Sequence, residues 1–203
     1  FQEAIQQGLF VKNEEGSPYM LPITAFDVGL LDLTNAATQE WMKDVLTNEV
    51  AGAGCSGWMV DFGESLPFDA HLESGADPYS YHNIYPVDWI RLNREAVEEA
   101  GLSSDVLLFN RSGYTETAGE SMLIWEGDQL TSWDQFDGLR SAMYGLINGG
   151  FSGIAINHSD CGGYTSLSLG GEGGGRSAEL LQRWVEMNAF TAALRTHEGN
   201  QPD

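Results

Sequence analysis

With 203 residues, the chain is long enough for one hydrophobic core or two small ones. Hydrophobic residues make up 42% of it and aromatic residues 11%, which excludes a disordered chain, and no apolar run approaches the roughly 20 residues that a membrane span needs. Nine basic residues against 30 acidic ones give a net charge of −21, and such a surface repels nucleic-acid phosphates and anionic membranes. We therefore expect no nucleic-acid partner and no membrane partner.

The predicted elements alternate between segments with helical spacing and short apolar runs. In chain order they are a helix through 41–49 after the cap candidate Asn35, a run at 58–60, a helix through 89–100 ended by Gly101, runs at 106–109 and 122–125, a helix through 139–147 ended by Gly149 and Gly150, a run at 154–156, and a helix through 180–188. Short, near-continuous apolar runs are typical of strands buried on both faces of a parallel sheet. Strands that alternate with helices predict an α/β fold built from parallel βα units.

Two glycine-containing segments interrupt this alternation of predicted strands and helices. The segment Gly113–Gly119 leaves little room for a full helix before the next apolar run, so it is predicted to be a loop. The tract Gly170–Gly175 is predicted to be a mobile loop from its composition. Because no strand runs directly into that tract, it does not fit a phosphate-binding loop.

Each apolar run ends in a polar or charged cluster. In a (β/α)₈ barrel the carboxyl ends of the strands converge on one face, and active sites are built there. The clusters then form one candidate site, made of Asp61, Glu64, Arg111, Asp128, Asp160 and His197. Carboxylates dominate this set, and glycoside hydrolysis needs two carboxylates, one to attack or stabilise the anomeric carbon and one to protonate the leaving oxygen. Any one of these residues taken singly could equally be a solvated strand end or a helix cap.

Other chemistries fit the sequence less well. The four histidines lack the spacing of a zinc site, and Cys55 and Cys161 form no CxxC pair and flank separate apolar runs, so no disulfide is expected. The run His158–Asp160 contains the residue types of a catalytic triad, but adjacent side chains on a strand point to opposite faces. No GxSxG motif is present. We expect no metal and no cofactor.

Five segments resemble blocks of glycoside hydrolase family 31. Residues 57–67, GWMVDFGESLP, resemble the nucleophile segment of the branch that reads DFGE rather than DMNE. Residues 125–129, WEGDQ, resemble the acid/base segment of that family. Three further blocks match the same branch, namely LDLTN at 31–35, HSDCGGY at 158–164 and RTHEGN at 195–200. The resemblance spans essentially the whole chain, with the blocks in the family's order.

For the fold, this resemblance implies an incomplete (β/α)₈ TIM barrel that runs from about the fourth strand to the eighth. Residues 1–203 would form the C-terminal part of the catalytic barrel. The first three strands and the N-terminal β domain of the family would lie outside this chain. We read the start at Phe1 and the stop at Asp203 in the same sense, as the two ends of a longer protein's segment.

For the chemistry, the resemblance implies Asp61 as nucleophile and Asp128 as general acid/base of a retaining α-glycosidase. Arg111 would contact the sugar and hold positive charge near the nucleophile. Glu64 would not contact the substrate but would orient the residues that do. The remaining sugar-site residues would be Trp125 as a wall of the −1 subsite, Asp160 and His197 as partners of sugar hydroxyls, and Tyr164 as a residue that helps to hold a sulfonate.

The branch includes sulfoquinovosidases, which release sulfoquinovose from plant sulfolipid headgroups, and proteins labelled α-glucosidases. We expect a hydrolase of α-sulfoquinovosides, with a small carbohydrate or a glycolipid headgroup as substrate; an α-glucosidase that acts on neutral α-glucosides is the alternative. A non-catalytic carbohydrate-binding protein is a third reading, and the presence of both Asp61 and Asp128 argues against it. The sulfonate-binding Arg and Trp of the family fall upstream of Phe1, and position 161 is Cys where the branch usually has Ile. The resemblance favours the cytoplasm, and the oligomeric state stays open.

Overall fold

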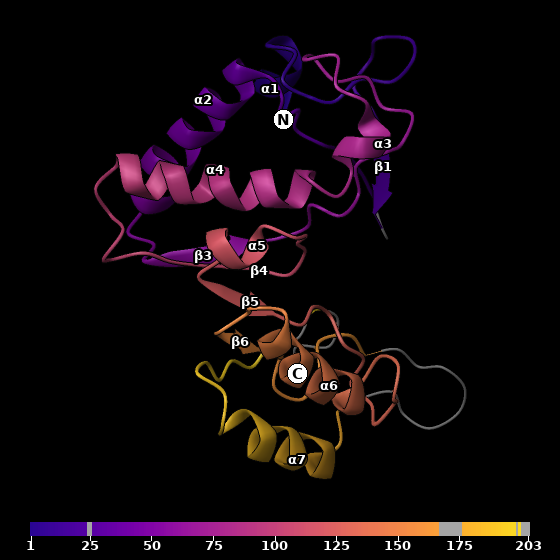
Figure 1. Ribbon diagram of the computed structural model, residues 1–203, viewed down its shortest axis with the longest axis vertical. Coiled ribbons are helices and arrows are strands. Elements are labelled where there is room, and N and C mark those ends of the chain that lie inside the picture. Colours follow the sequence, from indigo (N-terminus) through magenta and orange to yellow (C-terminus); the bar gives the residue numbers. More distant parts are fainter. Residues whose placement is uncertain (24–25, 167–175, 198, 200–203) are drawn as a thin grey trace. The chain divides into compact units, whose positions relative to one another are not determined.

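The computed structural model describes residues 1–23, 26–166, 176–197 and 199 (Figure 1). The chain divides into two compact units, Phe1–Ser121 and Met122–Asp203. The tract Gly170–Gly175, which the sequence predicts to be a loop, lies outside the described residues.

The first unit contains a parallel and an antiparallel pair of strands among its helices. Its elements are α1 (Gln2–Gln6), β1 (Met20–Ile23), β2 (Phe26–Gly29), α2 (Ala36–Asp44), the π-helix η1 (Val45–Ala51), β3 (Gly57–Val60), α3 (Pro78–Tyr81), α4 (Tyr85–Glu99), β4 (Leu107–Asn110) and α5 (Thr117–Glu120). Strands β1 and β2 are antiparallel, whereas β3 and β4 are parallel, with Val60 opposite Asn110. Because α4 lies between β3 and β4 in the chain and contacts both, these elements form the βα unit that the sequence predicts.

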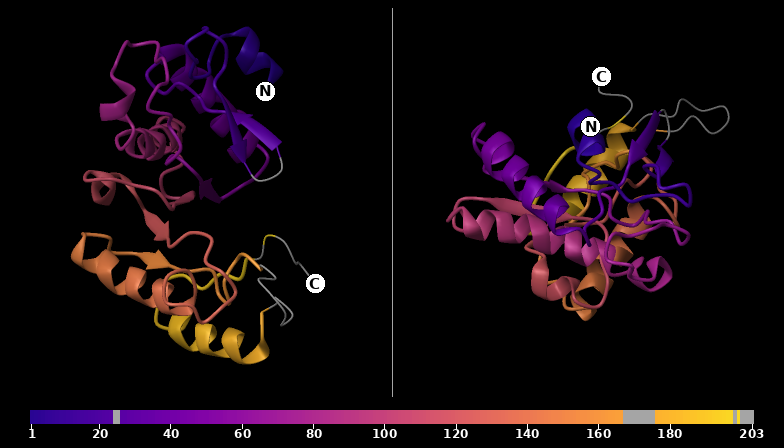
Figure 2. Two further views of the ribbon diagram at one scale, coloured as in Figure 1. Left: turned by 90° about the vertical axis from the view of Figure 1, so that its right-hand side faces the viewer. Right: turned by 90° about the horizontal axis from the view of Figure 1, so that it is seen from above.

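The second unit repeats this pattern. Its elements are β5 (Leu123–Trp125), α6 (Leu139–Phe151), β6 (Asn157–His158) and α7 (Ala178–Asn188). Strands β5 and β6 are parallel, with Trp125 opposite His158, and an isolated parallel bridge joins Asp160 to Arg195. Helices α6 and α7 lie side by side, as Figures 1 and 2 show. Both parallel strand pairs agree with a barrel built from βα units.

The four predicted helices are present, and their ends have local causes. The side chain of Asn35 accepts the amide of Ala37 at 2.9 Å and caps α2, and Ser177 caps α7 in the same way by accepting the amide of Leu180 at 3.1 Å. Gly101 follows α4 with φ at +71°, the left-handed conformation in which helices often end.

The predicted end of the third helix at Gly149 and Gly150 is wrong, because α6 continues to Phe151. Gly149 lies against the side chain of Asn157, and a Cβ at position 149 would come within 2.7 Å of the Asn157 amide nitrogen. That amide donates to the carbonyl of Leu146 at 2.9 Å. The glycine therefore allows close contact between α6 and β6 instead of ending the helix.

Two other boundaries differ from the prediction. The predicted loop Gly113–Gly119 contains the start of α5, because Glu120 forms ion pairs with Arg91 at 3.0 Å and Arg94 at 2.6 Å on α4 and so anchors one helical turn. The apolar run 154–156 precedes β6 rather than forming it. The carbonyl at the end of that run, on Ile156, accepts the amide of Ile124 at 3.1 Å, so the ladder begins where the run ends.

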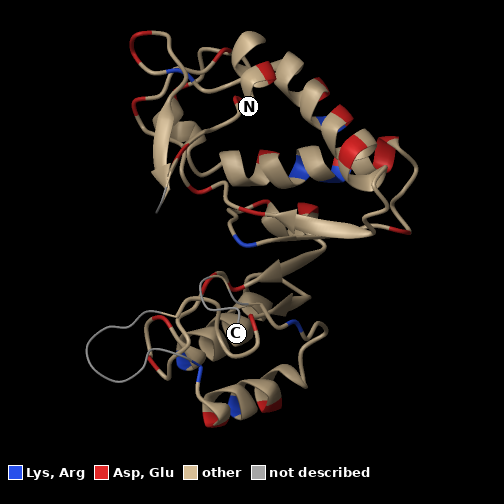
Figure 3. Ribbon diagram, turned by 180° about the vertical axis from the view of Figure 1, so that it is seen from behind, with Lys and Arg blue, Asp and Glu red and all other residues tan. Residues whose placement is uncertain are grey.

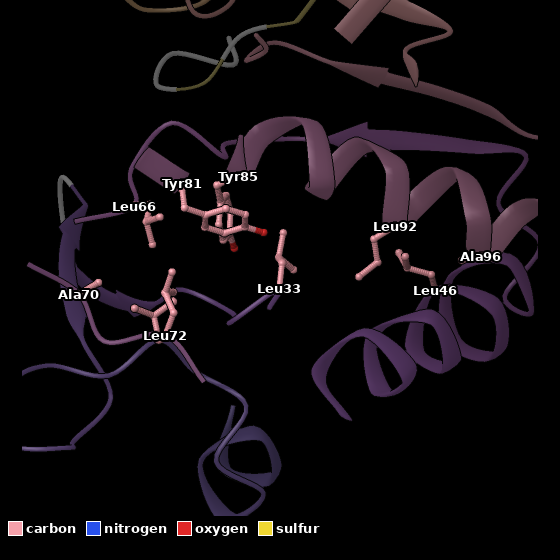
Figure 4. Close-up of a cluster of buried hydrophobic side chains, with 10 residues drawn as sticks. Leu33, Leu46, Leu66, Ala70, Leu72, Tyr81, Tyr85, Leu92 and Ala96 are labelled. Carbon is pink, nitrogen blue, oxygen red and sulfur yellow. The ribbon is translucent and has the colours of Figure 1, made fainter. Parts of the chain in front are cut away.

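The first unit has its own hydrophobic core between α4, α2 and the loop that follows β3. Leu66, Ala70 and Leu72 lie at one end of this cluster, Leu46, Leu92 and Ala96 lie at the other, and Tyr81, Tyr85 and Leu33 lie between them (Figure 4). The hydroxyl of Tyr85 donates to the carbonyl of Leu31 at 2.8 Å, so its polar atom is paired inside the core.

The surface carries the acidic excess. Figure 3 shows Asp and Glu on helices and loops of both units and few basic residues between them. Both cysteines are free, with Cys55 exposed and Cys161 buried, which confirms that they form no disulfide. None of the helices among the described residues is long and apolar enough to cross a membrane.

In the second unit a buried polar network attaches α7 to the end of β6. Ser159 is fully buried; its hydroxyl donates to the side-chain oxygen of Asn188 at 3.1 Å and accepts the indole N–H of Trp184 at 2.8 Å. The amide nitrogen of Asn188 donates to the carbonyl of Ser159 at 2.8 Å. Each polar group in this network is paired away from water, which makes the loss of one partner costly.

We predict that Asn188→Ala lowers the free energy of unfolding by about 2–3 kcal/mol, because it leaves the buried carbonyl of Ser159 without its donor and the buried hydroxyl of Ser159 without its acceptor. Urea unfolding of the full-length protein, followed by tryptophan fluorescence, measures the change. The matched control is Glu186→Ala on the exposed face of α7, which should change stability by less than about 0.5 kcal/mol. Equal unfolding midpoints for Asn188→Ala and the wild type would contradict the prediction.

Candidate active site

The predicted site residues fall into two groups, one in each unit. The first group begins at Asp61, which directly follows β3. The indole of Trp89 on α4 donates to the backbone carbonyl of Asp61 at 3.0 Å, and the amide of Phe62 donates to its carboxylate at 2.8 Å. The backbone and the carboxylate of Asp61 are thus both held by hydrogen bonds.

Arg111, at the end of β4, holds this carboxylate electrostatically. Its Nε lies 3.3 Å from Asp61 Oδ1, and its Nη2 lies 2.6 Å from Glu64 Oε1. The guanidinium also stacks over the ring of Phe62, 4.5 Å from the ring centre. Asp61 and Arg111 meet because they follow neighbouring parallel strands, as the sequence predicts, and Glu64 binds the other side of the same guanidinium.

The turn after Asp61 depends on an unusual backbone. Phe62 has φ at 59° and Gly63 has φ at +104°. A Cβ on Gly63 would come within 2.9 Å of the Ser112 hydroxyl and 3.1 Å of Pro86, and that hydroxyl donates to the carbonyl of Phe62. Only glycine fits at position 63, where the turn approaches the segment after β4.

A pocket of about 250 Å³ opens beside Asp61 within the first unit. Most of its lining is apolar and comes from the β1–β2 hairpin and from Tyr85 and Trp89 on α4. A largely apolar pocket with one charged group at its edge is the usual form of a small-molecule site.

The second group begins at β5. Trp125 ends this strand and is fully buried, and Asp128 follows it on an exposed turn that passes through Gly127 with φ at +86°. The turn is held by the amide of Glu126, which donates to the carbonyl of His158 at 2.9 Å, and by the side chain of Gln129, which donates to the carbonyl of Glu126. Asp128 therefore lies on an ordered turn and is exposed.

Asp160 is fully buried and forms an ion pair with Arg195 at 2.5 Å. Burial raises the pKa of Asp160, and the positive charges of Arg195 and His197 oppose that rise. Its second oxygen, Oδ2, is buried with no hydrogen-bond partner among the described residues. Because buried polar atoms are nearly always paired, this oxygen marks a place where a donor on a ligand would fit. The guanidinium of Arg195 also lies over the ring of Trp125 at 5.7 Å.

Tyr164 and His197 form an aromatic pair in the same unit. Their rings stack with centres 4.8 Å apart and an interplanar angle of 26°. The amide of Tyr164 donates to the carbonyl of Gln129 at 2.8 Å, which ties the pair to the turn that carries Asp128. The structure thus brings the five predicted residues of this unit into one connected network, made of Trp125, Asp128, Asp160, Tyr164 and His197.

Sequence reasoning missed one positioning residue in each group, Trp89 in the first and Arg195 in the second. Trp89 could not be assigned, because its indole contact with the Asp61 carbonyl joins two elements far apart in the chain. Arg195 stands in the RTHEGN block, but nothing in the block indicates that it pairs with Asp160, 35 residues earlier. Among the described residues, no group of three or more His, Cys, Asp or Glu could hold a metal ion.

Known proteins resemble this chain in sequence and in fold. Residues 1–203 match the model of the glycosyl hydrolases family 31 TIM-barrel domain. The chain is 40% identical to a sulfoquinovosidase of Escherichia coli (strain K12) over 99% of this chain and 29% of that protein. It is also 40% identical to a sulfoquinovosidase of Agrobacterium fabrum over 100% of this chain and 30% of that protein. The fold agrees with a family 31 sulfoquinovosidase from E. rectale in complex with an aza-sugar inhibitor, with a TM-score of 0.93, 42% identity and coverage of 100% of this chain and 30% of that one.

The matches establish the fold class, but the chain aligns with only a minor part of the length of each relative. The predicted TIM-barrel fold is confirmed by the family model and by the structural match. The chain spans less than a third of the length of these relatives. The chain is less similar to alpha-glucosidase 2 of Bacillus thermoamyloliquefaciens. The two are 24% identical over 97% of this chain and 25% of that protein.

Glu126 gives this site a testable pH dependence. Its carboxylate lies against Gly145, where a Cβ would overlap with it, and burial raises its pKa from 4.5 to about 7. The pKa of Glu126 is higher in the folded protein than in the unfolded chain. Its contribution to stability is therefore fully present below the pKa of the unfolded chain, and it is lost as the pH rises through about 7. The wild type should therefore lose unfolding free energy between about pH 5 and about pH 8, and Glu126→Gln should lose about 1–2 kcal/mol less over the same range. This figure allows for solvent screening of a partly exposed group.

Urea unfolding of the full-length protein at the two pH values checks this prediction. Glu49→Gln, which removes a carboxylate at an exposed position, is the control and should leave the pH dependence unchanged. The prediction fails if Glu126→Gln and the wild type lose the same stability as the pH rises.

Proposed function

Because the chain belongs to glycoside hydrolase family 31, we propose that the protein that carries it is a retaining α-glycosidase that hydrolyses α-sulfoquinovosides. The observation that carries this proposal is the 40% identity to two sulfoquinovosidases over 99 to 100% of the chain. The TM-score of 0.93 to a third sulfoquinovosidase supports it independently.

In the proposed reaction Asp61 attacks the anomeric carbon while Asp128 gives its proton to the leaving oxygen. The product of this step is an ester between the sugar and Asp61 and a released alcohol. A water molecule then attacks the same carbon, gives a proton to Asp128 and breaks the ester, so both carboxyls return to their first state. Two inversions give a product with the original α configuration.

The contacts of Asp61 support its role as nucleophile. A nucleophile must be ionised and fixed in direction, and Arg111 supplies a positive charge 3.3 Å from its Oδ1. The ion pair of Arg111 with Glu64 at 2.6 Å holds the guanidinium in place. We propose that Arg111 also contacts the sugar and that Glu64 orients it from behind.

In the second group we propose that Asp160 and His197 bind sugar hydroxyls and that Trp125 forms a wall of the −1 subsite. The buried, unpaired Oδ2 of Asp160 supports this, because a sugar hydroxyl would supply the donor that it lacks. We propose that Tyr164, whose phenol can donate to a sulfonate oxygen, helps to hold the charged end of the substrate.

We further propose that residues 1–203 supply the C-terminal part of the barrel, from about the fourth strand to the eighth. The parallel pairs β3–β4 and β5–β6 and the parallel bridge at Arg195 support this assignment. The share of the curated sulfoquinovosidases that the chain spans, 29 to 30%, also agrees with it.

We predict that Asp61→Asn lowers kcat by at least about a thousandfold, because the amide can neither attack nor leave. The measurement is release of 4-nitrophenol from the α-sulfoquinovoside by the full-length enzyme. Asp69→Asn is the matched control, since Asp69 is exposed and its carboxylate accepts a hydrogen bond from the hydroxyl of Tyr19. The assignment of Asp61 fails if the variant keeps a tenth of the wild-type rate.

We predict that kcat/KM for the 4-nitrophenyl α-sulfoquinovoside exceeds that for the α-glucoside by at least about a hundredfold. A site that pairs a charged group leaves its donors unpaired when that group is absent. Tyr164→Phe should lower kcat/KM for the sulfoquinovoside by about tenfold and leave the glucoside nearly unchanged. If the wild type cleaves both substrates equally well, the protein is an α-glucosidase, the alternative that the match to the Bacillus enzyme favours.

A further inference from the structure

Arg176 joins two separate segments of the second unit. It lies just before α7, and its Nε donates to the carbonyl of Gly162 at 3.1 Å. Its Nη2 donates to the carbonyl of Gly163 at 2.7 Å and to the carbonyl of His197 at 3.3 Å. One guanidinium thus binds the loop after β6 and the segment around His197.

The backbone of the loop is shaped to receive this guanidinium. Gly162 and Gly163 both have left-handed φ angles, +92° and +82°, and their carbonyls both accept from Arg176. A Cβ on Gly162 would overlap with the guanidinium, and a Cβ on Gly163 would come within 2.7 Å of the Leu130 carbonyl. The two glycines therefore admit an arginine on one side and the segment after Asp128 on the other.

The two segments that Arg176 joins carry the stacked rings. Tyr164 directly follows Gly163, and its ring stacks on His197 at 4.8 Å. Gly199 approaches Tyr164 as well, since a Cβ at that position would overlap with the phenol and its amide donates to the Tyr164 carbonyl at 3.2 Å. The guanidinium of Arg176 thus fixes the backbone beside Tyr164 and that of His197 at the same time.

We propose that Arg176 is a positioning residue for the sugar: it holds Tyr164 and His197 in the stacked geometry in which they bind the substrate. This inference rests on the proposed function of those two residues as sugar ligands. Arg176 binds the backbone carbonyls beside the two rings, so we assign its effect to the position of the rings and not to the reacting atoms. A planar guanidinium can serve three carbonyls at once, whereas the ammonium of lysine, on a flexible stem, cannot match this fork.

The experiment measures kcat and KM of the full-length enzyme for the 4-nitrophenyl α-sulfoquinovoside with Arg176→Met and Arg176→Lys. We expect KM to rise by about tenfold or more in both variants while kcat stays within about threefold, because the binding rings move and the two carboxyls do not. Arg183→Met on α7 is the matched control, since the side chain of Arg183 is 53% exposed and pairs with Glu186 on the same helix; it should keep both constants.

If Arg176 only stabilised the fold, its loss would change kcat and KM in the opposite way. Loss of folded enzyme lowers the apparent kcat and leaves KM unchanged, because the molecules that remain folded bind normally. That result in Arg176→Met would overturn the proposal, and so would full recovery of KM in Arg176→Lys. Because KM does not depend on enzyme concentration, the test can be read even when part of the variant fails to fold.

A double-mutant cycle tests the route through Tyr164. In the Tyr164→Phe background, Arg176→Met should raise KM by much less than it does alone, because coupled residues are not additive. Full additivity would overturn the proposed route. A wild type that cleaves no α-glycoside overturns the proposed function and this inference together, whereas an active wild type whose KM is unaffected by Arg176→Met overturns this inference alone.

Discussion

The ion pair between Asp160 and Arg195 is the contact on which the second group of site residues depends. Asp160 is fully buried, and a buried carboxylate that loses its partner costs several kcal/mol. The same arginine lies over Trp125, and the parallel bridge between Asp160 and Arg195 brings His197 next to the loop of Tyr164. The ion pair leaves one oxygen of Asp160 unpaired, so one contact both builds the network and leaves an acceptor for a ligand.

The sequence predicts the arrangement of the site where proximity follows from topology. Asp61 and Arg111 each follow a strand, and neighbouring parallel strands bring their ends together, so their contact could be expected from the chain order alone. The pairing of Asp160 with Arg195 and the contact of Trp89 with Asp61 could not, because they depend on side-chain packing between distant segments. The predicted ends of two elements were wrong for the same reason, because they also depend on side-chain packing between distant segments. Gly149 reads as a helix end but makes room for Asn157, and Glu120 forms a helical turn because two arginines of another helix bind it.

The net charge of the chain and the charge of its proposed substrate have the same sign, and salt screening decides how far their repulsion reaches. A net charge of −21 repels an anionic sugar. Exposed charges act over only about 8 Å at physiological salt, so the groups near the ligand decide its binding. Arg111, Arg176 and Arg195 are three of the nine basic residues in the chain, and each lies in one of the two site groups. Many acidic residues lie on helices and loops of both units (Figure 3), but Asp61, Glu64, Asp128 and Asp160 lie in the same site groups, where Arg111 and Arg195 pair with three of them.

The consecutive glycines at 162 and 163 restrict which substitutions the loop after β6 can accept. Every substitution at either position adds a side chain where the guanidinium of Arg176 or the carbonyl of Leu130 already lies, and both backbones are left-handed. A substitution at either position would therefore have to displace one of these groups and adopt a backbone conformation that side chains rarely take. Tyr164 directly follows the two glycines, so a substitution there changes a side chain that the loop presents and keeps both glycines in place.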